Sequence, residues 1–206
     1  ELDLSENSFT GTLPTKLGQL TSLNYLWLSD NNLNGTVPTE VCELSWLVEL
    51  HLGNNSFTGN LPTEIGQLTE LRALLINLNQ LNGTLPTELG LLTKLGFFYL
   101  GSNSFSGTLP TEFGNLTDLL KLELSENSLT GTLPTELGQV FGLTELYVNN
   151  NNLNGTLPTE LGRLEGLQRL YLQENMFTGT LPTELGELMS LEEFNATENE
   201  FSGSIP

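Results

Sequence analysis

The side chains that could perform catalysis are few, and they do not form pairs or triads. His51 is the only histidine and Cys42 the only cysteine among the 206 residues. One residue of each type is too few for a metal-binding cluster, and no nucleophile motif accompanies them. Glu123 and Glu126 lie close together in sequence, but among 25 acidic residues such pairs are typical of a solvated surface. We therefore expect no enzymatic activity, no metal site and no cofactor.

A second set of residues is suited to binding rather than to catalysis. Each of them stands between the two leucines, or their substitutes, of a recurring L-x-L motif, and most are aromatic or apolar. We call this set the central lane: Asp3, Trp27, His51, Leu75, Tyr99, Glu123, Tyr147, Tyr171 and Asn195. Neighbouring outward positions hold Tyr25, Leu78, Phe97 and Arg169. Tyr and Trp are common anchors of interfaces because they offer a large contact area at a small entropic cost.

A repeat of 24 residues positions the central lane. All nine prolines, from Pro14 to Pro206, are spaced by 24 residues, and nine asparagines from Asn7 and nine glycines from Gly11 keep the same step. A fixed period of this length predicts a solenoid. We expect one domain over residues 1–206 with about nine repeats. Because the sequence begins and ends within a repeat, we also expect an uncapped fragment of a longer protein.

Each repeat predicts a strand followed by a returning segment. In the L-x-L motif, side chains alternate between faces, so both leucines point inward and the residue between them points outward. Stacked strands then form a parallel sheet with about 4.8 Å between neighbours. The repeated Asn follows the strand, where its amide can satisfy backbone groups at a turn. The Thr after each Pro, from Thr15 to Thr183, resembles the N-cap of a short helical turn.

The repeat pattern L-x-x-L-x-L-x-x-N-x-[LF]-[TN]-G-[TN]-[LV]-P resembles the plant-type leucine-rich repeat over the whole chain. Relatives of this type include ectodomains of plant receptor-like kinases, polygalacturonase-inhibiting proteins and algal cell-surface proteins, and the T-G-T-L-P-T-E-L-G wording is similar to diatom repeats. The resemblance implies an α/β solenoid, a right-handed superhelix with a parallel sheet on the concave face and short helical or 3₁₀ turns on the convex face. It also implies an extracellular or cell-surface location. The paired cysteines of the family's caps are absent, and Cys42 replaces a repeated Gly, where we expect a small buried side chain.

The charge of the chain excludes some partners. Acidic residues outnumber basic ones 25 to 6, which gives a net charge of −19. Such a surface repels phosphate backbones and anionic lipids, so we expect no nucleic-acid partner. No stretch approaches the roughly 18 apolar residues of a membrane span, so we expect no direct span in this fragment.

Six Asn-x-Ser/Thr sequons predict candidate glycosylation sites if the chain enters a secretory route. They lie at Asn34, Asn54, Asn82, Asn115, Asn154 and Asn195. The repeat consensus itself supplies several of them, as Asn-Gly-Thr.

Three functions remain open. The first is a recognition or adhesion scaffold that binds a protein or peptide on the concave face, with Trp27, His51, Leu75, Tyr99, Glu123, Tyr147, Tyr171, Tyr25, Phe97 and Arg169 as the candidate ligand-binding residues. The second is binding of a polysaccharide by stacking of the same aromatic rings on sugars. The third is a structural or ice-ordering surface made by the repeated threonines: Thr12, Thr36, Thr84, Thr108, Thr132, Thr156 and Thr180, interrupted by Asn60.

Overall fold

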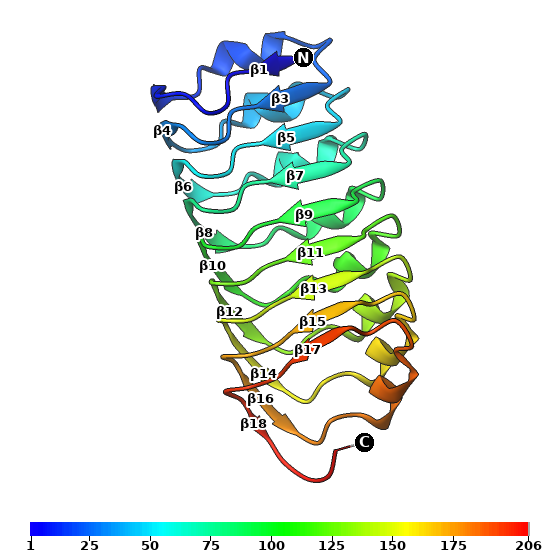
Figure 1. Ribbon diagram of the computed structural model, residues 1–206. Helices are drawn as coiled ribbons and strands as arrows, with labels where there is room; N and C mark the ends of the chain where they lie inside the picture. The colour runs from blue at the N-terminus through cyan, green and yellow to red at the C-terminus, as the bar shows by residue number, and fades with distance from the viewer. Residues whose placement is uncertain (206) are drawn as a thin grey trace.

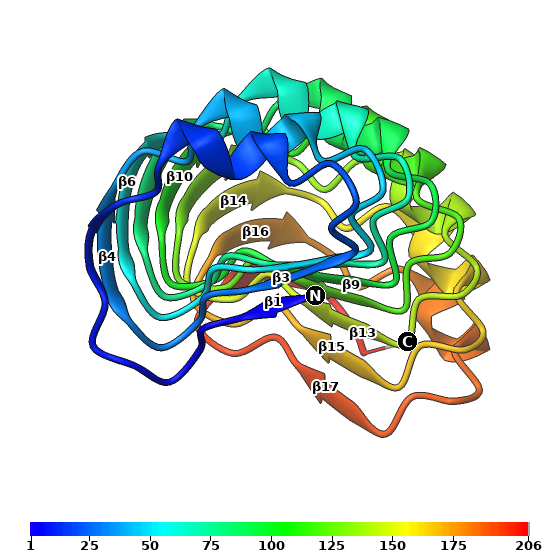
Figure 2. The same cartoon turned by 90° about the horizontal axis from the view of Figure 1, so that it is seen from above.

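The computed structural model describes residues 1–205 and shows a right-handed solenoid (Figure 1). Along the chain, a strand of one sheet, a strand of a second sheet and a 3₁₀ helix follow one another and then recur. The two sheets are parallel, and each has nine strands. Seen from above, the 3₁₀ helices line the convex side and the first sheet lies across from them (Figure 2). The expected leucine-rich-repeat solenoid is confirmed.

The first sheet, which we call the inner sheet, contains the L-x-L motifs. Its strands pair in sequence order, each with the strand one repeat later. They are β1 (Leu2–Asp3), β3 (Tyr25–Trp27), β5 (Glu49–His51), β7 (Ala73–Leu75), β9 (Phe97–Tyr99), β11 (Lys121–Glu123), β13 (Glu145–Tyr147), β15 (Arg169–Tyr171) and β17 (Glu193–Asn195). Residues with the same place in the repeat are therefore direct neighbours across the sheet, as Trp27 and His51 are.

The second sheet was not predicted from the sequence. It is built by the F/L-x-G-T segments that follow each repeated Asn. Its strands are β2 (Thr10–Thr12), β4 (Asn32–Gly35), β6 (Ser56–Asn60), β8 (Gln80–Thr84), β10 (Ser104–Gly107), β12 (Ser128–Gly131), β14 (Asn152–Gly155), β16 (Met176–Gly179) and β18 (Glu200–Phe201). This sheet flanks the inner one and leads the chain toward the helices.

The helical segments are all 3₁₀ helices of five residues, and residues 1–205 contain no α-helix. They are η1 (Thr15–Gln19), η2 (Thr39–Glu43), η3 (Thr63–Gln67), η4 (Thr87–Leu91), η5 (Thr111–Asn115), η6 (Thr135–Gln139), η7 (Thr159–Arg163) and η8 (Thr183–Glu187). Within the described residues, none of these helices has the length and apolarity needed to cross a membrane.

The predicted threonine N-caps are wrong. Each helix begins at the Thr itself, the preceding Pro is the capping residue, and no side chain caps the end. As the first helical residue, Thr has its hydroxyl displaced from the N–H groups that an N-cap would bind. Thr63 Oγ1 instead lies 3.4 Å from Glu64 Oε2, and other repeats show the same contact. Leu17, in the first helix, donates its N–H to the carbonyl of Pro14.

A single apolar core runs the length of the solenoid. Leu26, Leu50 and Leu122 of the inner strands are fully buried, and Phe57 and Phe105 of the second strands pack behind them. Each repeat alone exposes most of its apolar side chains, so stacking of successive repeats must supply the stability.

The repeated asparagines satisfy backbone groups at the turn, as predicted, and they also connect neighbouring repeats. In Asn79, Nδ2 donates to the carbonyls of Leu52, Ile76 and Asn77, and Oδ1 accepts from the N–H of Phe57. Asn31, Asn103, Asn127, Asn151, Asn175 and other members of the ladder repeat this arrangement. One amide therefore satisfies backbone groups of two adjacent repeats that no strand partner reaches.

The repeated glycines allow the repeats to approach closely on the second sheet. Gly131 has a φ of +76°, in the left-handed region, and a Cβ atom there would lie 2.8 Å from Cγ2 of Thr108 in the preceding repeat. The methyl group of Thr108 thus occupies the space that a side chain at position 131 would need. Thr12, Thr36, Thr84, Thr132, Thr156 and Thr180 lie against the next repeat's glycine in the same way. These threonines are exposed and form a row that we call the threonine lane.

Candidate ligand-binding face

The exposed face of the inner sheet carries the central lane. Strand pairing places Trp27 beside His51, His51 beside Leu75, and Leu75 beside Tyr99. On the other half of the sheet, Tyr147 pairs with Tyr171. The lane side chains from Trp27 to Asn195 are half-buried, with one side against the sheet and the other toward solvent. The strand geometry thus gives a continuous row of half-exposed side chains without any loop.

An aromatic cluster occupies the N-terminal part of this face. Trp27 stacks on His51 with ring centres 5.7 Å apart and planes 20° apart, and Tyr25 tilts against Trp27 at the same distance. Glu49 holds the two stacked rings, because its Oε2 accepts from Trp27 Nε1 at 3.0 Å and lies 3.3 Å from His51 Nε2. A shallow hollow of about 240 Å³ lies beside Trp27 and His51, with Asp30 on its wall.

His51 has a lowered pKa because partial burial disfavours the charged imidazolium, although the carboxylates of Glu49 and Asp3 act in the opposite direction. At neutral pH the ring is therefore uncharged and contributes to the cluster as an aromatic side chain.

The middle of the face is apolar. Leu75 and Tyr99 are adjacent in the central lane, and Phe97 lies next to Ala73, which is buried. Leu78, at a turn with a φ of +56°, is 49% exposed, and Phe97 is 39% exposed. Burial also raises the pKa of the Tyr99 hydroxyl. This segment could bury an apolar side chain of a ligand.

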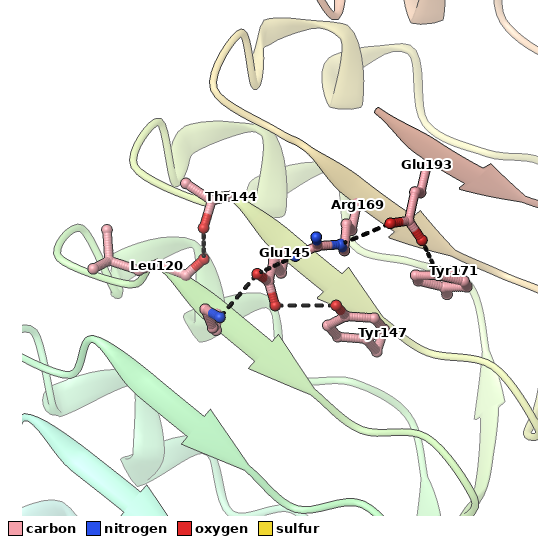
Figure 3. A network of polar contacts seen from close by, with 8 residues as sticks. Leu120, Thr144, Glu145, Tyr147, Arg169, Tyr171 and Glu193 are labelled. Carbon is pink, nitrogen blue, oxygen red and sulfur yellow. Dashed lines mark hydrogen bonds and ion pairs between the residues drawn. The ribbon is translucent and has the colours of Figure 1, made fainter. Parts of the chain in front are cut away.

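A second aromatic stack occupies the C-terminal part of the face. Tyr147 and Tyr171 lie parallel, with ring centres 5.0 Å apart and planes 16° apart. The hydroxyl of Tyr147 donates to Glu145 at 3.0 Å, and that of Tyr171 donates to Glu193 (Figure 3). Arg169 bridges the two carboxylates, with Nη1 2.9 Å from Glu145 and Nε 3.2 Å from Glu193.

Lys121 extends this network, because its Nζ lies 2.8 Å from Oε1 of Glu145. Basic and acidic residues thus alternate across four strands, in the order Lys121, Glu145, Arg169 and Glu193. Glu145 is largely buried; burial alone would raise its pKa, but hydrogen bonds from Lys121 and Tyr147 lower it below the ordinary value. Burial and the bond to Glu145 raise the pKa of Tyr147 to about 12. The hydrogen bond to Glu193 likewise raises the pKa of Tyr171, so the rings of Tyr147 and Tyr171 are both fixed and neutral at physiological pH.

Glu123, a central-lane residue, is bound to the backbone rather than free. Its Oε2 accepts from the N–H of Gly101 at 2.9 Å, and its Oε1 accepts from the N–H of Ser125 at 2.9 Å and from the Ser125 hydroxyl. The carboxylate occupies the space that a side chain at position 101 would take. Glu123 separates the apolar middle from the tyrosine stack.

Sequence reasoning missed the residues that orient the rings. Glu49, Lys121 and Glu145 stand two residues before the central lane on the same strands, so their side chains share its face. This spacing of two residues from the central lane is the sequence feature from which their position on the same face could have been predicted. Glu193 occupies the same position on β17 and belongs to the same row.

The predicted glycosylation sites lie apart from one another. Asn34, Asn82 and Asn154 are exposed on strands of the second sheet. Asn54 lies in the turn after an inner strand and donates to Asp30 at 2.6 Å, whereas Asn195 ends the central lane. Asn115 ends η5 on the convex side, between the exposed residues Leu91 and Phe141.

Cys42 is buried, and burial raises its pKa to about 12. Residues 1–205 contain no group of three or more potential metal-ligating side chains.

Comparison with known proteins finds similar structures among plant receptors. The chain is similar over its full length to the Arabidopsis receptor kinase HAESA, solved with the peptide hormone IDA and the co-receptor SERK1, at 35% identity and a TM-score of 0.96. It is similar over its full length to the plant peptide hormone receptor RGFR1, solved with RGF2, at 31% identity and a TM-score of 0.85. The chain covers 34% and 36% of these two structures, about a third of each.

A plant ice-binding protein is also similar, at 29% identity and a TM-score of 0.77 over the whole of this chain and 74% of the other. No curated protein matches. The Leucine Rich Repeat family model matches residues 1–20, 22–44, 46–68, 94–116, 118–140, 142–164 and 166–188. The chain therefore belongs to the leucine-rich-repeat family, with repeats of the plant type.

Proposed function

We propose that this chain is a non-catalytic, extracellular or cell-surface binding scaffold whose inner face binds a peptide or a segment of a protein partner. The observation that carries the proposal is the pair of aromatic stacks, Trp27 with His51 and Tyr147 with Tyr171, fixed on the exposed side of a rigid sheet. Rings held in place before binding lose little entropy when a ligand arrives, so their contact area contributes to affinity.

The similar receptors support the same function. HAESA and RGFR1 were solved with peptide ligands, and the present chain has their fold over its full length. Binding of a polysaccharide would use the same rings, since aromatic faces also stack on sugars. A glycan array in the test therefore separates this alternative from peptide binding.

The test is a binding screen of the intact chain against a peptide display library and a glycan array. A variant with Trp27→Ala, Tyr99→Ala and Tyr147→Ala is compared with a control that removes two exposed aromatic residues away from the inner sheet, Trp46→Ala and Phe141→Ala. Peptide hits that the first variant loses and the control retains support the proposal. Hits on glycans alone, or hits that both variants retain, contradict it.

The threonine lane supports a second candidate, an ice-ordering surface. Contact with the next repeat's glycine fixes the threonine methyl groups, so the exposed hydroxyls form a regular row with a spacing of about 4.8 Å. The similarity to a plant ice-binding protein favours the same idea. Asn60 interrupts the row.

Thermal hysteresis and inhibition of ice recrystallisation test this candidate. Thr108→Tyr together with Thr132→Tyr, which disturb the row, should abolish any activity, whereas Tyr147→Ala on the inner sheet should not. Absence of activity in the unmodified chain contradicts the candidate.

A further inference from the structure

The hydrogen bonds of the two aromatic stacks indicate which kind of chemical group a ligand of the inner face should carry. Trp27 Nε1 and the hydroxyls of Tyr147 and Tyr171 already donate to carboxylates of the face. His51 Nε2 also lies against Glu49. In these four side chains, one face of each ring lies against its stacking partner, and the donors at the ring edges are used, so the opposite ring face is what remains for a ligand.

The positive charges of the inner strands are used as well. Lys121 and Arg169 are the basic residues of these strands, and both are ion-paired to Glu145, with Arg169 also paired to Glu193. Arg72 precedes β7 and lies outside the strand. The charges of both strand cations are therefore already balanced by carboxylates of the same face.

Acceptors remain beside the stacks. The turn after each inner strand carries a residue with positive φ, and in five repeats that residue is acidic and exposed: Glu6, Asp30, Glu126, Glu174 and Glu198. Glu174 follows Tyr171 by three residues and accepts a hydrogen bond from the uncharged side-chain amide of Asn150. No basic side chain of the described residues pairs with these five carboxylates.

We propose that the ligand of the inner face is a basic peptide, with an arginine or lysine side chain over the Tyr147–Tyr171 stack and within reach of Glu174. Ring faces attract cations through the aromatic quadrupole, and a planar guanidinium also stacks on them. The net charge of −19 adds long-range attraction for such a peptide. This inference rests on the proposed function and names the chemical class of the ligand.

The closing experiment is selection from a display library that contains basic, acidic and neutral peptides in equal numbers. We expect the selected peptides to contain Lys or Arg, and replacement of the key Arg by citrulline to weaken binding by about tenfold, the scale of one desolvated cation–π contact. Tyr147→Ala with Tyr171→Ala should weaken binding by at least as much. Glu126→Gln with Glu174→Gln should weaken it and reduce its salt dependence.

The matched control removes two acidic residues from the convex side, Glu165→Gln and Glu187→Gln, at the same loss of charge. Equal weakening by both charge variants overturns the inference, since binding would then depend on net charge alone. Selection of acidic or neutral peptides that still need Tyr147 overturns the basic ligand but leaves the proposed function standing. Selection of no peptide that depends on the rings contradicts both.

Discussion

Oδ1 of Asn79 accepts a hydrogen bond at 2.9 Å from the backbone N–H of Phe57, one repeat earlier in the solenoid. The same side chain donates to the carbonyls of Leu52, Ile76 and Asn77. One amide therefore closes a turn within its own repeat and joins it to the previous one. The ladder of such residues is the polar counterpart of the apolar core.

Asn79→Ala should lower the free energy of unfolding by about 3 kcal/mol, because an N–H and three carbonyls lose their partner. Denaturant unfolding measures the loss. Asn152→Ala is the control, since Asn152 is exposed on β14 and its side chain makes no hydrogen bond within residues 1–205. Equal losses in the two variants would show that the ladder contributes nothing specific.

Gly114→Ala should destabilise the chain by about 1–3 kcal/mol through overpacking. A Cβ atom there would lie 2.6 Å from the backbone oxygen of Glu136 in the next repeat. Cys42 occupies the corresponding place in its own repeat, so Cys42→Ala should cost less, about 1 kcal/mol for the lost sulfur. Thermal unfolding of both variants tests this order, and a larger loss for Cys42→Ala would contradict it.

Acidification should weaken the network around Glu145. Its pKa in the folded chain is below the ordinary 4.5, so its charge stabilises the fold above that value and the contribution disappears as pH falls through the lowered pKa. Thermal unfolding measured from pH 7 down to about pH 3 should show a steeper decline for the parent than for Glu145→Gln. If the unfolding temperatures of the two proteins fall in parallel with pH, Glu145 does not contribute to the pH dependence of stability.

An N-glycan on Asn115 should cover two exposed apolar side chains. Asn115 lines a hollow on the convex side together with Leu91 and Phe141, which are 58% and 67% exposed. We expect mass spectrometry of chain secreted from a eukaryotic host to find Asn115 modified, and enzymatic removal of the glycan to lower the unfolding temperature. In Phe141→Ser, removal of the glycan should lower the unfolding temperature by less. An equal decrease in the parent and in this variant would exclude contact between the sugar and the Phe141 ring.

The sequence predicted the inner sheet and the Asn ladder because both depend on the type of a residue and its place in the repeat. Leu50 and Asn55 have the same neighbours as their equivalents in other repeats, so one pattern describes them all. The second sheet escaped prediction because its segments lack the two-residue alternation of a typical strand, each being interrupted by a glycine with positive φ, such as Gly59. The helix start was misplaced by one residue because Thr63 has the side chain of an N-cap but the backbone of a first helical residue.

The site was predictable only in outline. Alternation along each strand was enough to place Trp27 and Tyr147 on one face. Trp27 and Tyr171 are held by carboxylates of the next strand, Glu49 and Glu193, whereas Tyr147 is held by Glu145 of its own strand. The contacts to the next strand join residues of two repeats whose side chains vary, so the consensus of one repeat does not predict them.

Trp27 pairs with His51, and every inner-strand residue pairs with the one 24 positions later. This regular pairing affects how the gene can evolve. Unequal crossing-over between copies of the repeat deletes or duplicates a whole unit and leaves every ladder continuous. Only the number and order of residues in the central lane change. A lineage can thus recombine the residues of its exposed inner face as modules while the architecture that displays them is inherited intact.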